Sequence, residues 1–188
     1  MQFSPFPVLE TERLILRRVT ADDAADVFIM RSDPEVMRYI PRPIAVTVED
    51  ATVLIKMMDD FIAKNEKINW GMEWKETKQI IGMIGYVNLK PEHFRAEVGY
   101  SLSRVWHRRG IMREALLEVM KYGFEHFKLH TIEAITDAEN IASGKLLESV
   151  GFRQEACFKE DFLFEGRFRN SIHYGILYEE GKEKGICV

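Results

Sequence analysis

The chain has 188 residues, of which 46% are hydrophobic and 30% are charged. This composition is typical of a globular protein with a packed core and argues against a disordered chain or a fibrous repeat. Because 30 acidic residues outnumber 26 Lys and Arg residues, the net charge is −4, which gives no overall attraction for nucleic acid or an anionic membrane surface. Two cysteines, Cys157 and Cys187, indicate neither a disulfide framework nor a multi-cysteine metal site.

The chain begins without a basic and apolar leader, and it contains no run of about 18 apolar residues that would span a membrane. With so few cysteines, a reducing cytosol suits it best. No linker or internal repeat interrupts the sequence. We therefore expect a cytoplasmic protein that forms a single domain over residues 1–188, with its core at about 8–180.

The first third of the chain is predicted to begin with a strand and to continue with helices. Alternation of apolar and polar residues indicates one strand over Leu9–Arg17. Thr20, which two acidic residues follow, is typical of a helix start, and Pro34 ends that helix. Further helices are predicted at Glu35–Tyr39 and Thr47–Lys64, where apolar residues recur at helical spacing.

The rest of the chain alternates strands with helices, which predicts one mixed α/β (α+β) sheet with helices packed on its faces. Gly123 lies within the apolar stripe of the long helix, and we expect it to allow close approach to the sheet. The predicted elements are a hairpin of Asn69–Trp74 and Gln79–Leu89, a strand at Ala96–Leu102, a helix after Gly110, a strand at Thr131–Thr136, a helix from Asn140 to Gly151, and a hairpin of Phe158–Phe164 and Arg167–Tyr178 before a charged tail.

A cluster of arginines marks the start of the long helix. The segment Arg108–Arg113 lies where a strand gives way to that helix, so the unpaired helical N–H groups and the positive end of the helix dipole face one spot. Together with Arg104, four arginines within ten residues of an acidic protein favour a small polyanion such as a diphosphate. From charge alone, a solvated basic face is the alternative. No triphosphate-binding or dinucleotide-binding glycine motif is present.

Two segments resemble the signatures of a known family. Arg108–Met112 with Glu114-Ala115 resembles the coenzyme A pyrophosphate loop of the GNAT N-acetyltransferases. Asn140–Ser143 with Gly151-Phe152 resembles the second signature of that family, at a matching spacing. The resemblance implies a GNAT-like mixed, mostly antiparallel central sheet with helices on both faces.

Three further segments are similar to the RimJ/RimL branch of this family, which acetylates ribosomal-protein N-termini. They are the opening Thr11–Arg17, the strand Glu97–Tyr100 and the turn Gly166–Phe168. The resemblance covers about residues 8 to 180. It implies direct transfer of an acetyl group from acetyl-CoA to an amine, with no acyl-enzyme. The five histidines of the chain show no metal-site spacing, so no metal is expected.

The resemblance also implies how the donor is bound. The family splays one strand edge, so backbone groups of that strand would pair with the pantetheine amides. Asn140 resembles the residue that hydrogen-bonds the pantetheine arm, and simple N-capping of its helix is the alternative role. The family loop usually has Gln or Arg where this chain has His107. The implied cofactor-binding residues are Val98, Tyr100, Leu102, Arg108, Arg109, Gly110, Ile111, Met112, Arg113, Asn140 and Ser143.

The chemistry requires a neutral amine and a proton for the leaving thiolate. Glu97, on the strand before the loop, is the candidate base, with an ordinary outward-facing carboxylate as the alternative, because alternation does not fix its face. Ser143 is the candidate acid by resemblance, and it can equally cap the helix or contact the cofactor. The tyrosine acid of many GNAT enzymes is replaced here by Leu147. Cys157 is expected to be a half-buried strand thiol rather than a nucleophile.

The sequence therefore predicts an acetyl-CoA-dependent N-acetyltransferase that acts on a primary amine, with a protein or peptide N-terminus, such as that of a ribosomal protein, as acceptor. A small amine, such as a polyamine, an antibiotic or an amino-acid-like compound, is the alternative acceptor. A non-catalytic acyl-CoA-binding module is the alternative from another functional class. Coenzyme A is the expected partner, and a homodimer is one possible assembly.

Overall fold

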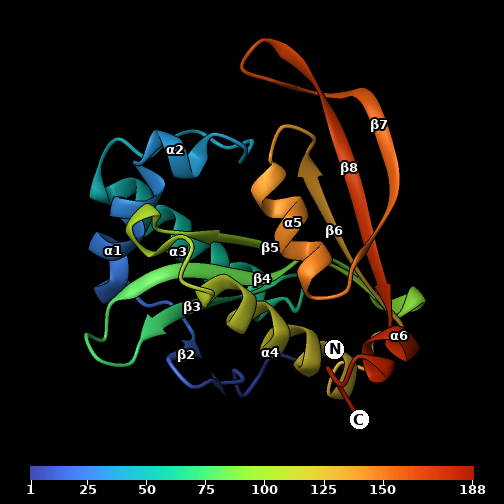
Figure 1. Ribbon diagram of the computed structural model, residues 1–188. Coiled ribbons are helices and arrows are strands. Elements are labelled where there is room, and N and C mark those ends of the chain that lie inside the picture. The colour runs from blue at the N-terminus through green and yellow to red at the C-terminus, as the bar shows by residue number, and fades with distance from the viewer.

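A computed structural model describes all residues, 1–188 (Figure 1). One eight-stranded sheet has the order β1-β2-β3-β4-β5-β6-β8-β7, and β5 with β6 is its parallel pair while the other neighbours are antiparallel. The strands are β1 (Leu9–Glu10), β2 (Leu14–Arg17), β3 (Ile68–Trp74), β4 (Ile80–Lys90), β5 (Arg95–Leu102), β6 (Thr131–Asp137), β7 (Arg153–Phe164) and β8 (Arg167–Leu177).

Helices cover both faces of the sheet, as predicted (Figure 1). Two separate apolar clusters mark the two faces: the larger lies under α4 and α5, and the smaller joins α1 and α3 to the opposite side. No helix is both long and apolar enough to traverse a bilayer. The helices are α1 (Ala24–Arg31), α2 (Pro34–Met37), α3 (Val48–Ala63), α4 (Ile111–Glu125), α5 (Ile141–Ser149) and α6 (Tyr178–Glu183), and short 3₁₀ turns are η1 (Ala21–Asp23), η2 (Pro91–His93) and η3 (Arg104–Trp106).

Gly123 lets α4 lie directly against β4, which confirms the close approach expected from the sequence. A β-carbon at Gly123 would stand 2.0 Å from the hydroxyl oxygen of Tyr86. That hydroxyl is fully buried and donates to the carbonyl of Val119 at 2.9 Å. The helix axis is therefore fixed against the middle of the sheet, and with it the position of the loop that precedes α4.

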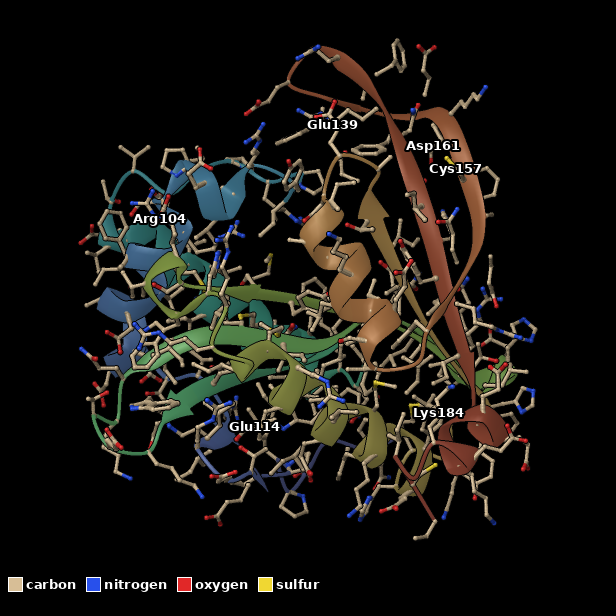
Figure 2. The ribbon with its side chains drawn as sticks, viewed as in Figure 1. Arg104, Glu114, Glu139, Cys157, Asp161 and Lys184 are labelled. Atoms are coloured by element: carbon tan, nitrogen blue, oxygen red, sulfur yellow. The ribbon has the colours of Figure 1, made fainter.

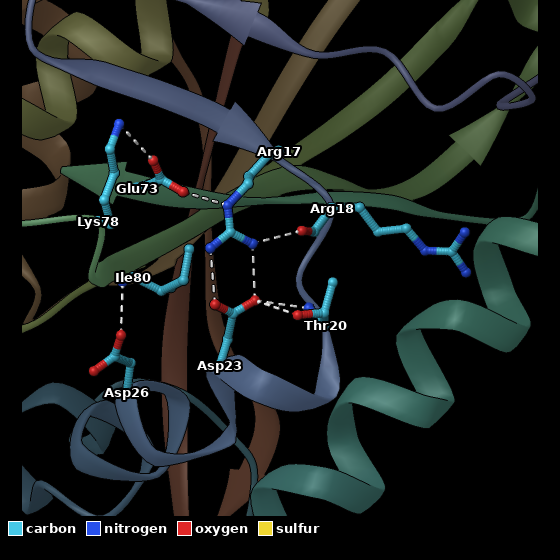
Figure 3. Close-up of polar contacts among 8 residues, drawn as sticks. All are labelled: Arg17, Arg18, Thr20, Asp23, Asp26, Glu73, Lys78 and Ile80. Carbon is cyan, nitrogen blue, oxygen red and sulfur yellow. Dashed lines mark hydrogen bonds and ion pairs between the residues drawn. The ribbon is translucent and has the colours of Figure 1, made fainter. Parts of the chain in front are cut away.

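A partly buried ionic network ties η1, which leads into α1, to β2 and β3 (Figure 3). The Arg17 guanidinium donates to Glu73 at 2.5 Å and to both carboxylate oxygens of Asp23 at 2.8 Å. Burial opposes ionisation of Asp23, but the hydrogen bonds from Arg17 and Thr20 outweigh it and hold the pKa of Asp23 below its ordinary value. The charges are thus compensated inside the protein, and α1 is held in place beside the sheet.

The observed element order confirms the predicted one, with three differences in detail. The single strand expected over Leu9–Arg17 is wrong, because Thr11 N–H bonds to the Leu14 carbonyl and turns the chain between β1 and β2. The last hairpin begins earlier, since β7 starts at Arg153. The expected charged tail contains α6, which packs Gly181 against Phe124.

Candidate active site

The loop between η3 and α4 presents a row of unpaired N–H groups. The main-chain N–H groups of residues 108 to 113 have no hydrogen-bond acceptor in the protein, and the next one, Glu114 N–H, donates to the Gly110 carbonyl. Gly110, the N-cap, has φ of +73°, and Arg108 has φ of +60°, both in the left-handed region. A chain that curls in this way turns consecutive N–H groups toward a common point, which is an anion-binding geometry.

The charged side chains of the loop are available to an anion. Arg108, Arg109 and Arg113 are exposed and form no ion pair, whereas Arg104 lies 3.6 Å from Asp33. The Ile111 and Met112 side chains are buried in the core, so these two residues have only their main chain to offer a ligand. Unpaired N–H groups at a helix start, together with three unpaired guanidinium groups, fit a diphosphate and hence coenzyme A.

The gap between β5 and β6 opens beside this loop. The parallel pairing covers only Arg95–Glu97 of β5, so the rest of β5 has no strand partner on that side. Ser103 N–H bonds to Ile81 of β4. Because antiparallel strands alternate their bonded pairs, the main-chain groups of Val98, Tyr100 and Leu102 face away from β4 and into the gap. The splayed edge that the resemblance implies is therefore present.

His107, the unusual residue of the loop, lies at the end of this edge. Its Nε2 is 2.9 Å from the Leu102 carbonyl oxygen. Leu102 therefore already has a partner for its carbonyl, and its N–H is the group left for a ligand. The side chain that departs from the family pattern thus joins the splayed strand to the anion loop.

Two hydroxyl groups meet on the face of the sheet that carries α4 and α5. The Tyr100 and Ser143 hydroxyl oxygens are 2.8 Å apart. Burial raises the pKa of Tyr100 to about 12, so this side chain is protonated at neutral pH. Asn140 caps α5 by accepting the Ser143 N–H at 3.2 Å, which confirms the capping role, and its amide N–H groups have no protein partner. Leu147 is buried and cannot supply a proton.

Glu97 lies on the opposite face. Its neighbours Ala96 and Val98 are buried under α4, which turns the Glu97 side chain away from that helix. The residue is half-buried at the last paired position before the gap, in register with Glu133. Burial raises the pKa of Glu97 above its ordinary value, the repulsion from Glu133 adds to this, and a hydrogen bond from Asn88 opposes it.

A bulge in β4 lies directly opposite Glu97. The register shifts between Tyr86 and Asn88, so that Glu97 pairs with Asn88 and Val87 is the extra residue. A β-carbon at Gly99 would be 3.0 Å from the Val87 side chain, so Val87 covers the next position along β5 on the Glu97 side. Bulges commonly re-aim side chains beside active sites, and this one provides the apolar and amide surroundings of the carboxylate.

Cys157, which was considered from the sequence, lies elsewhere, and so does Asp161 (Figure 2). Cys157 is on β7 and exposed, so the half-buried position expected for it is wrong; its strand is at the sheet edge and has no covering element on that side. Asp161 lies near the tip of the β7 and β8 hairpin, where it accepts the Ser171 N–H and hydroxyl at 3.0 and 2.6 Å. Neither side chain borders the splayed edge.

One contact to the loop was not expected. Arg13, between β1 and β2, donates to the carbonyl of Arg109, and together with Thr11 it binds Glu114 in the first turn of α4. The sequence signal was present, because Thr11 and Arg13 belong to one of the segments that resemble the RimJ/RimL branch. Pattern alone gave these residues no role, since they are about 100 residues away from the loop in the chain.

Comparison with known proteins identifies the family. A family model described as an acetyltransferase (GNAT) domain matches residues 13–153. The uncharacterized N-acetyltransferase YoaA of Bacillus subtilis (strain 168) is 37% identical, over 92% of this chain and 97% of its own length. The [ribosomal protein uS5]-alanine N-acetyltransferase of Escherichia coli (strain K12) is 30% identical, over 62% of this chain and 60% of its own.

A solved structure agrees with both comparisons. The GNAT-family acetyltransferase of Bacillus anthracis superposes with a TM-score of 0.83 and 29% identity, over 92% of this chain and 99% of that one. The family match covers most of the sheet, the anion loop and the splayed edge, and the YoaA relation extends over nearly the whole chain. The chain therefore belongs to the GNAT family of acetyl-CoA-dependent N-acetyltransferases.

Proposed function

We propose that this enzyme acetylates the α-amine of a peptide or protein N-terminus, by direct transfer from acetyl-CoA in a ternary complex. The observation that carries the proposal is the run of unpaired N–H groups at residues 108 to 113, which adjoins the splayed edge of β5. The donor supplies the acetyl group as a thioester. The anion loop binds its diphosphate, and the edge at Val98, Tyr100 and Leu102 binds its pantetheine arm.

Glu97 and Ser143 act from opposite faces of β5. Glu97 accepts a proton from the incoming ammonium, directly or through one water, because its partly buried carboxylate lies where the gap begins. Ser143 donates a proton toward the leaving sulfur. Tyr100 supports this role: by donating its own hydroxyl proton to the Ser143 oxygen, it leaves the Ser143 proton free to point elsewhere. The base and the acid thus approach one carbonyl carbon, at which the C–N bond forms and the C–S bond breaks, from two sides of the gap.

The charges across the gap favour a single amine over a polyamine. The acidic side chains of β6 are already paired, Glu133 with Arg95 and Asp137 with Arg169 at 2.8 Å. A polyamine would need an unpaired carboxylate for each further ammonium group. Between these two acids, Ile135 is 43% exposed on the Glu97 side, where it offers an apolar contact to the first side chain of a peptide. The similarity to the uS5-alanine enzyme supports the same acceptor class.

The test is a competition among acceptors. The purified protein is incubated with acetyl-CoA and one of three amines: a ribosomal-protein N-terminal peptide that contains an internal lysine, the same peptide with a formylated N-terminus, or spermidine. Thiol release gives kcat/KM, and mass spectrometry locates the acetyl group. We expect acetylation of the free N-terminus and none of the formylated peptide above background. A higher kcat/KM for spermidine, or acetylation of the internal lysine, would refute the proposed acceptor.

A further inference from the structure

The turn between β1 and β2 holds the first turn of α4 through one carboxylate. Glu114 accepts the Thr11 hydroxyl at 2.6 Å and the Arg13 main-chain N–H at 2.9 Å on one oxygen. Its other oxygen accepts Arg13 Nε–H at 2.7 Å and forms an ion pair with Arg13 Nη2 at 2.6 Å. Both carboxylate oxygens of Glu114 thus accept hydrogen bonds, and the start of α4 is bound to a segment near the N-terminus.

The same guanidinium also sets the plane of a peptide unit in the anion loop. Arg13 donates from its remaining nitrogen to the Arg109 carbonyl at 2.9 Å. In a trans peptide, the carbonyl and the N–H of the next residue point in opposite directions. Because Arg13 holds the Arg109 carbonyl, the Gly110 N–H, which has no acceptor in the protein, is turned away from Arg13.

The contact also compensates an unfavourable charge. An acidic side chain in the first turn of α4 would repel a bound anion if it were left alone. Burial opposes ionisation of Glu114, yet the hydrogen bonds from Thr11 and Arg13 outweigh it and hold the pKa of Glu114 below its ordinary value. Since Arg13 compensates this charge, Arg108, Arg109 and Arg113 remain available to the ligand.

An aromatic stack holds the loop from the outside. The Arg13 guanidinium lies 6.0 Å from the Trp74 ring of β3, the Trp74 and Trp106 rings are 4.7 Å apart, and the Arg109 guanidinium lies 5.1 Å from Trp106. Cations near aromatic faces are attracted by the ring quadrupole. Arg13 is therefore held in its position by the sheet, independently of any ligand.

We propose that Arg13, supported by Thr11 and Glu114, is a positioning residue for the donor: it orients the Gly110 peptide so that the loop N–H groups converge on the diphosphate. The inference rests on the proposed binding of the donor diphosphate by this loop. It makes the turn between β1 and β2 a determinant of donor affinity.

The test compares two ligands that differ in the diphosphate. Coenzyme A carries it and pantetheine does not, and their Kd values are measured by calorimetry and by ligand-observed NMR. Arg13→Lys keeps the charge, but a single ammonium group cannot reach both Glu114 and the Arg109 carbonyl in the same geometry. Arg18→Lys is the matched control, because exposed Arg18 is bonded to Asp59 of α3, away from the loop.

We expect Arg13→Lys to weaken coenzyme A binding by about tenfold or more, the effect of one charge-assisted hydrogen bond, while the Kd of pantetheine changes less than about twofold. Thr11→Val provides a second, milder variant of the same shape, with a smaller loss in the same direction. If Arg13→Lys fails to fold, Thr11→Val decides the question alone.

The two hypotheses fail in different ways. If the wild-type protein binds coenzyme A no more tightly than pantetheine, the diphosphate is not bound and the proposed function of the loop is wrong, whatever the variants do. If the wild type prefers coenzyme A and the foldable variants keep that preference in full, Arg13 does not orient the loop. An equal loss for both ligands shows a general structural role and also refutes the inference.

Discussion

Replacing Glu97 by glutamine tests the side of the mechanism that acts on the acceptor. The substitution keeps the shape and the hydrogen-bonding capacity toward Asn88 but removes the proton acceptor. Loss of a general base typically lowers the rate by about 10²-fold or more, and we expect that loss in kcat/KM at pH 7. Because only the ionised carboxylate accepts a proton, wild-type activity is present above the raised pKa of Glu97 and is lost as the pH falls through it. The pH profile of the Glu97→Gln variant lacks this loss of activity at low pH.

The kcat/KM of the Glu97→Gln variant depends on pH, and this dependence indicates which class of amine is the acceptor. An α-amine with a pKa of about 7.8 is roughly one-seventh neutral at pH 7 and almost wholly neutral at pH 9. With such an acceptor, the kcat/KM of the Glu97→Gln variant therefore rises at most about sevenfold between pH 7 and pH 9. A lysine-like amine with a pKa of about 10.4 would instead regain about a hundredfold, since its neutral fraction keeps rising. One pH series thus examines the base and the acceptor class together.

The control measurements separate chemistry from folding. A carboxyl whose pKa is raised by folding weakens the folded state when it is ionised, so at neutral pH the Glu97→Gln protein is expected to melt at the same temperature as the wild type or higher. Its Kd for coenzyme A stays unchanged. The exposed Glu92→Gln variant serves as the matched control and keeps full activity. Wild-type kcat/KM in Glu97→Gln across the pH series would remove Glu97 from the mechanism.

Two further predictions concern the other face of the sheet. Ser143→Ala is expected to lower kcat about tenfold or more with an unchanged Kd for coenzyme A. Tyr100→Phe is expected to lower kcat less, because Ser143 keeps its own proton. Steady-state kinetics that show equal rates for Ser143→Ala and the wild type would contradict the acid role of Ser143. Gly123→Ala is expected to lower the free energy of unfolding in urea by about 2 to 3 kcal/mol, because the new methyl group displaces the Tyr86 hydroxyl. Adding Tyr86→Phe is expected to recover part of this loss. If the two substitutions change the free energy of unfolding additively, the contact is refuted.

Features carried by neighbouring residues were predictable from the sequence. The anion loop occupies six consecutive positions, and the meaning of its arginines and Gly110 depends only on where one helix begins. The hairpin strand predicted at Gln79–Leu89 is found one residue further on, at Ile80–Lys90. Its apolar residues follow directly on a turn, which indicates a strand although burial along it does not alternate. Helix α6 was missed for the opposite reason: it has few apolar residues, and packing of Gly181 on Phe124 stabilises it.

The distant contacts of the site could not be read from the pattern. Tyr100 and Ser143 are 43 residues apart, and no periodicity indicates that their hydroxyl groups meet. The face that Glu97 occupies was likewise open, because alternation along β5 is satisfied by either orientation. The structure decides it through long-range packing: α4 covers Ala96 and Val98, and Glu97 takes the other side.

The bulge and the splay together explain why one strand can serve both halves of the reaction. The bulge of β4 sets Val87 and Asn88 beside the Glu97 face, where burial raises the pKa of Glu97 and Asn88 opposes the rise. The end of pairing with β6 at the same residue opens the path to the other face. Beyond Glu97 the edge of β5 is free for the donor, and Tyr100 on that edge reaches Ser143. A regular sheet here would bury the carboxylate between paired strands and close the gap. The irregularities on the two sides of Glu97 are therefore what the proposed chemistry needs.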